Sequence, residues 1–65
     1  MNRTQQLKTL FDILVDIHTG RNNMHPQVAA QFHVEGFVAR HKNDKYFDQL
    51  LQEEIEDCGR VTVAA

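Results

Sequence analysis

The chain has 65 residues, which is enough for one domain at most, and so short a chain predicts a thin hydrophobic core. Its only cysteine excludes an intramolecular disulfide, and the lack of serine excludes a serine nucleophile. The net charge is −2 with neutral histidines, and no apolar run approaches the length of a membrane-spanning helix. We therefore expect a small soluble protein of the cytoplasm that makes no membrane contact. Helix packing, metal binding or oligomerisation could stabilise so small a fold, and we favour a homo-oligomer or an obligate partner.

The charges are distributed unevenly along the chain. Residues 1–45 carry six basic and four acidic side chains, a net charge of +2. Residues 46–65 carry one basic and five acidic side chains, a net charge of −4. Such asymmetry can mark an interaction surface, although a solvated acidic face on the last helix is the simpler interpretation.

The first predicted helix spans about residues 4–19. Ile13 and Val15 lie off its main apolar stripe and predict a second neighbouring element. The main stripe follows the i, i+3, i+4, i+7 spacing of one helix face and consists of Leu7, Leu10, Phe11, Leu14 and Ile17.

The second predicted helix spans about residues 26–41, with Pro26 at the first helical position, where its missing N–H costs nothing. Gly36 lies inside it, costs about 1 kcal/mol relative to alanine, and could allow a close approach, a kink or a split. The helix has two apolar edges, one of Val28, Ala29 and Phe32 and one of Val34, Phe37, Val38 and His41.

The third predicted helix spans about residues 44–58 and ends near Gly59. Residues 61–63 alternate as a strand would, but no other strand is predicted, so we expect a short extended or disordered C-terminal tail. The chain is thus predicted to be a single all-α, three-helix domain over residues 1–65, with dimerisation through the first two helices as a further hypothesis. The apolar stripe of the third helix consists of Phe47, Leu50, Leu51, Ile55 and Cys58.

Residues at the predicted helix ends have the side chains that capping requires. Thr4 or Asn2 can accept a backbone N–H bond at the first N-terminus, and Asn43 or Asp44 can do so at the third. Gly20 lies where a residue in the left-handed conformation would end the first helix.

The four histidines do not have the spacing of a zinc motif. His18, His25, His33 and His41 are seven or eight residues apart, whereas zinc ligands usually come in close pairs on adjacent turns. A site assembled across the fold from His18, His25 and Cys58 is the remaining alternative. We predict no metal and no cofactor.

The sequence also gives no support for catalysis. Cys58 would need a lowered thiol pKa to act as a nucleophile, whereas its acidic neighbours Glu54, Glu56 and Asp57 would raise that pKa. The chain has only three glycines and no phosphate-binding glycine loop. We expect that the protein is not an enzyme.

A DNA-binding helix-turn-helix over residues 28–45 is the alternative hypothesis. Ala29 and Val34 fit that motif, but His33 occupies the position of the turn glycine and Gly36 comes three residues late. Base contacts usually come from the N-terminal part of a recognition helix, whereas the basic residues here lie at its far end. The overall acidic charge also disfavours binding to phosphates.

Three features describe the chain as a whole. They are its short length, the amphipathic segments Leu7–Ile17 and Phe47–Cys58, and the histidine-rich centre His25–His41. In these features it resembles the short accessory proteins encoded in the early regions of lambda-like temperate phages and prophages. The resemblance implies a regulatory protein that acts in the host cytoplasm by binding a host or phage protein, and it assigns no functional residue.

We therefore predict a non-enzymatic regulatory or accessory protein that binds another protein. The candidate contact residues form two sets of opposite character. The basic set is Phe37, Arg40, His41, Lys42 and Lys45, and the acidic set is Glu53, Glu54, Glu56 and Asp57.

Overall fold

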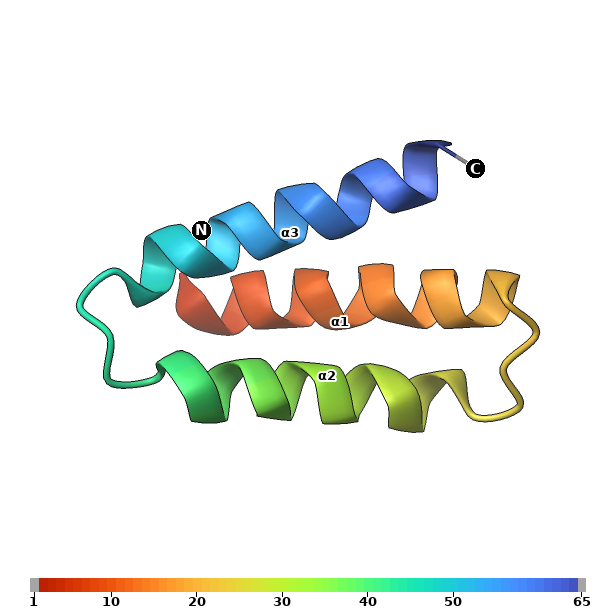
Figure 1. Cartoon of the computed structure of the whole chain (residues 1–65), viewed down its shortest axis with the longest axis horizontal. Helices are drawn as coiled ribbons and strands as arrows, with labels where there is room; N and C mark the ends of the chain where they lie inside the picture. The colour runs from red at the N-terminus through yellow and green to blue at the C-terminus, as the bar shows by residue number, and fades with distance from the viewer. Residues whose placement is uncertain (1, 65) are drawn as a thin grey trace.

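The computed structural model describes residues 2–64, with side chains for residues 2–61, and contains three α-helices (Figure 1). These are α1 (Arg3–Gly20), α2 (Pro26–His41) and α3 (Phe47–Ala64). The described residues form no strand, so the predicted all-α, three-helix domain is confirmed. None of these helices is both long enough and apolar enough to cross a membrane.

The helix α1 lies between the other two helices and contacts both (Figure 1). The helix α2 runs antiparallel to α1, α3 runs parallel to it, and α3 inclines away from α1 toward its C-terminal end. Ile13 and Val15, which predicted a second neighbour for the first helix, are both partly buried against the core. The helices α2 and α3 pack mainly on α1 and little on each other.

The buried core is thin, as the chain length predicts. Leu10 and Leu51 are fully buried, and such burial stabilises the fold by roughly 1.5–3 kcal/mol for each side chain. Phe37 of α2 meets Phe47 of α3 edge to face, with ring centroids 5.8 Å apart. The other buried residues are Leu14, Ala30 and Cys58.

The N-terminus of α1 is closed by a capping box. The Asn2 side chain accepts the backbone N–H of Gln5 at 2.8 Å, and the Gln5 side chain accepts the backbone N–H of Asn2 at 3.3 Å. This arrangement satisfies two backbone donors that a helix start leaves without partners. Of the two predicted caps, Asn2 is therefore the one used.

The C-terminus of α1 corrects the prediction for Gly20. Gly20 is the last helical residue and no described glycine has a positive φ, whereas Asn22 has φ 59°. The backbone N–H of Asn22 donates to Thr19 and that of Asn23 donates to His18, each at 3.0 Å, which is the Schellman pattern. The left-handed residue is thus Asn22, two positions later than expected, because asparagine also tolerates this conformation.

The helix α2 is continuous through Gly36. A Cβ at this glycine would meet only the end of the flexible Arg40 side chain, at 3.4 Å, so no other element approaches it closely. The turn that a helix-turn-helix would need near the middle of residues 28–41 is therefore not formed.

The helix α3 begins later and ends later than predicted. The side chain of Asp44 accepts the backbone N–H of Tyr46 at 2.8 Å, which forms a turn that delays the helix to Phe47. The helix then passes through Gly59 and reaches Ala64, so residues 61–64 continue the helix where an extended tail was expected. Without a neighbouring strand, the helix is what satisfies these backbone groups. Ala65 lies outside the described residues.

Candidate functional site

The outer face of α2 carries an exposed apolar patch. Val28 and Phe32 lie one turn apart and are 52% and 70% exposed. Met24, in the preceding loop, is 88% exposed and borders the same shallow hollow as Val28. We call Met24, Val28 and Phe32 the α2 stripe. No charged residue occurs between Arg21 and Glu35, so the stripe lies in an uncharged stretch of the chain.

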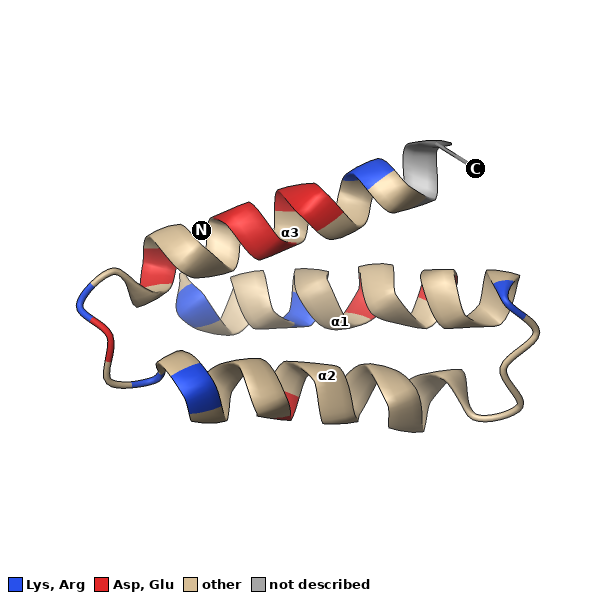
Figure 2. Ribbon diagram, viewed as in Figure 1, with Lys and Arg blue, Asp and Glu red and all other residues tan. Residues whose placement is uncertain are grey.

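The predicted basic contact set is only partly at the surface. Arg40, Lys42 and Lys45 are exposed near the turn between α2 and α3 (Figure 2). Phe37 is 3% exposed and belongs to the core, so it cannot contact a partner. His41 is partly buried, with its ring centroid 4.8 Å from that of Phe37. Of the predicted basic set, only the three cations Arg40, Lys42 and Lys45 are therefore exposed for contact.

The predicted acidic contact set lies along α3 (Figure 2). Glu53, Glu56 and Asp57 are exposed, and Asp57 pairs with Arg60 at 3.0 Å. Glu54 differs from the other three because it is only partly exposed and turns toward α2. We call Glu53, Glu56 and Asp57 the acidic face of α3.

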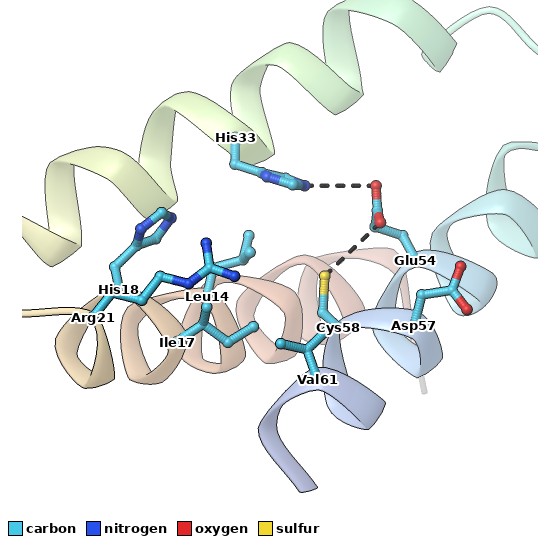
Figure 3. Close-up of a pocket in the computed structure, with 9 residues that line it drawn as sticks. All are labelled: Leu14, Ile17, His18, Arg21, His33, Glu54, Asp57, Cys58 and Val61. Carbon is cyan, nitrogen blue, oxygen red and sulfur yellow. Dashed lines mark hydrogen bonds and ion pairs between the residues drawn. The ribbon is translucent and has the colours of Figure 1, made fainter. Parts of the chain in front are cut away.

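A hollow of about 290 Å³ lies among the three helices, on the side where α3 inclines away from α1 (Figure 3). Its apolar wall comes from α1 and α3, and titratable side chains from all three helices or their ends surround it. The lining residues are Leu14, Ile17, His18, Arg21, His33, Glu54, Asp57, Cys58 and Val61.

Three side chains with different donor atoms converge at this hollow (Figure 3). The Nε2 of His33 lies 3.5 Å from Oε2 of Glu54, and the Cys58 thiol donates to Oε1 of the same carboxylate at 3.8 Å. The helical spacing of four residues between Glu54 and Cys58 places both on one face of α3. The nitrogen, oxygen and sulfur atoms of the three residues all lie within 4.8 Å of one another.

The His33 side chain is 37% exposed, yet its Nε2 atom is buried and forms no hydrogen bond. The 3.5 Å contact with Glu54 is an ion pair only when the imidazole is protonated. A buried polar atom without a hydrogen bond costs free energy, and the polar group that faces this nitrogen is the carboxylate of Glu54.

Burial raises the pKa of the Cys58 thiol above its ordinary value of 9.0, and the nearby carboxylates of Glu54 and Asp57 raise this pKa further. The thiol therefore stays protonated at neutral pH in the absence of a metal ion. This environment is the opposite of one that activates a cysteine nucleophile.

The sequence located some of these residues but not the cluster. His18 and Cys58 both line the hollow, whereas His25 borders a different one, so the alternative trio with His25 does not come together. The spacing of the histidines and the cysteine does not predict this cluster, because one of its three members is a carboxylate. The signal was a carboxylate and a cysteine four residues apart on a helix, at Glu54 and Cys58.

In comparisons with protein-family models, with curated proteins and with solved structures, nothing matches this chain.

Proposed function

We propose that this chain is a non-enzymatic accessory protein that forms a dimer through the α2 stripe and binds a basic protein partner through the acidic face of α3. The observation that carries the proposal is the α2 stripe itself. An aromatic side chain as exposed as Phe32, next to Val28 and Met24, is typical of a protein contact surface.

A second copy of this chain suits the stripe for two reasons. Residues 22–34 include no Asp, Glu, Lys or Arg, and Glu35 is the one charged residue that lines a hollow with Val28 and Phe32, so two copies related by a two-fold axis would bring few like charges together there. A domain of this size also has a small core, and pairing of two stripes would add buried apolar surface.

The acidic face of α3 stays accessible in such a dimer. The α2 stripe and the acidic face of α3 belong to different helices, which flank α1 in Figure 1, so pairing through the α2 stripe would leave the acidic face open to solvent. Residues 46–65 carry the net charge of −4, and the described part of α3 places the carboxylates of Glu53 and Glu56 in solvent. Such a surface favours a partner rich in lysine and arginine.

The early-region resemblance suggests a host or phage protein as this partner. The test is affinity capture from bacterial lysate, with and without nuclease treatment, using the wild-type chain and the double variant Glu53→Lys/Glu56→Lys. We expect a captured basic protein that is lost in the double variant and reduced at high salt. The matched control is Asp12→Lys/Asp16→Lys, which reverses two exposed acidic charges on α1, away from this face.

Capture that survives the double variant would overturn the role of the acidic face. Capture that disappears after nuclease treatment and in Arg40→Glu/Lys42→Glu would instead establish the nucleic-acid alternative. The exposed cations Arg40, Lys42 and Lys45 favour that alternative, whereas the continuous helix α2 gives it no recognition helix.

A further inference from the structure

The cluster at the hollow has the donor set of a metal site. An imidazole nitrogen, a carboxylate oxygen and a cysteine sulfur are the three ligand types that zinc accepts in proteins. In a tetrahedral zinc site with ordinary bond lengths, ligand atoms lie about 3.3–3.7 Å apart. The distance of 3.5 Å from Nε2 of His33 to Oε2 of Glu54 lies in this range, and Sγ of Cys58 lies 3.8 Å from the other oxygen of the same carboxylate, Oε1.

The third distance also permits coordination. A ring nitrogen of His33 and the Sγ atom of Cys58 lie no more than 4.8 Å apart, so bringing both to bonding distance from one ion needs a movement of about 1 Å. Both atoms belong to side chains on helices, which can make such a movement by small rotamer changes. The ligands therefore need no backbone rearrangement.

A cation would also satisfy the unpaired nitrogen. The buried Nε2 atom of His33 forms no hydrogen bond and faces the carboxylate of Glu54. A divalent ion between them would give this nitrogen a partner, neutralise the carboxylate and take the sulfur of Cys58 as its third ligand.

The position of the cluster gives such an ion a structural role. The helices α2 and α3 pack little on each other, and the aromatic contact between Phe37 and Phe47 joins them near the turn between the two helices. On both helices the cluster lies farther from that turn than the two rings do, where α3 has inclined away from α1. A shared ion would therefore join α2 to α3 where side-chain packing is sparse. Small domains commonly use a metal ion in this way.

The other charged groups at the hollow do not supply a fourth ligand to such an ion, so its fourth coordination position would be open to water. Asp57 already pairs with Arg60 at 3.0 Å. Arg21 and His18 come from the end of α1 and lie across the hollow from the cluster (Figure 3). The fourth position would then face the hollow.

We propose that His33, Glu54 and Cys58 form a zinc-binding site that joins α2 to α3. In binding, the sulfur–zinc bond replaces the S–H bond of Cys58, and the proton passes to the buffer. The proposal does not depend on dimerisation or on the acidic face of α3.

The test is titration of the full chain with Zn²⁺ against a chromophoric chelator, and with Co²⁺ followed by absorption. We expect one ion per chain, the charge-transfer band of a cobalt–thiolate bond and a rise in the thermal midpoint with zinc. The variant His33→Gln should bind zinc at least about tenfold more weakly, because even the loss of a supporting residue typically costs that much. Glu54→Gln should weaken binding similarly.

The matched control is His25→Gln, which removes an exposed histidine that does not line the hollow and should leave the affinity unchanged. Circular dichroism establishes that each variant is folded. Absence of zinc binding by the wild-type chain would overturn the proposal. Equal losses in His25→Gln and His33→Gln, or a cobalt spectrum without the thiolate band, would do so as well.

Discussion

Phe37 on α2 and Phe47 on α3 meet edge to face with ring centroids 5.8 Å apart, and both rings are buried. Because this pair joins the two outer helices, we expect Phe37→Ala to lower the free energy of unfolding by about 3–5 kcal/mol. Urea denaturation followed by circular dichroism measures this loss. The control is Tyr46→Ala, which truncates an aromatic ring that is 57% exposed and should change stability by about 0.5 kcal/mol or less. Similar losses in both variants would place Phe37 outside the core.

At the end of α1, alanine substitutions at Gly20 and Asn22 are expected to change the stability in opposite directions. Gly20 is helical and a Cβ there would meet nothing within 4 Å, so Gly20→Ala should raise the stability by about 0.4–1 kcal/mol. Asn22 has φ 59°, so Asn22→Ala should lower the stability by about 1 kcal/mol. Thermal unfolding of both variants measures the two changes. A destabilised Gly20→Ala would restore Gly20 as the left-handed residue.

The raised pKa of Cys58 predicts how stability depends on alkaline pH. Burial and the carboxylate of Glu54 favour the neutral thiol in the folded state. The stability gained in this way is complete below the ordinary pKa of 9.0 and is lost as pH rises through the higher folded-state value.

Unfolding measured in the presence of a chelator over neutral to alkaline pH tests this dependence. The wild-type chain should lose more stability above pH 9.0 than Cys58→Ala, which carries the same lysines and tyrosine but no thiol. Parallel pH profiles would show that the folded state does not favour the protonated thiol.

The sequence predicted the three helices because their apolar residues recur at helical spacing, and it predicted the second neighbour of α1 from Ile13 and Val15. The exact residues at which the helices end were harder to predict from the sequence. Whether Gly20 or Asn22 adopts the left-handed conformation depends on differences of about 1 kcal/mol, and both residue types tolerate it. The continuation of α3 through Gly59 was missed because a glycine inside a helix costs little more than that.

The positions of the α2 stripe and of the cluster depend on which face of each helix packs against α1. For α2, the spacing of apolar residues does not predict which face that is. Either of its two apolar edges could have been the one that packs in the core. The structure buries the edge with Phe37 and exposes the edge with Phe32, so the predicted aromatic contact falls on a different residue. The cluster of His33, Glu54 and Cys58 joins residues more than 20 positions apart, and only the packing of α2 and α3 around α1 brings them together.

Sedimentation velocity over a range of protein concentrations tests the proposed dimer most directly. The wild-type chain should sediment as a dimer at high concentration, Phe32→Glu as a folded monomer, and Tyr46→Glu, which alters another exposed aromatic residue, as the wild type does. A wild-type chain that stays monomeric at every concentration, or a Phe32→Glu variant that still dimerises, would contradict the account.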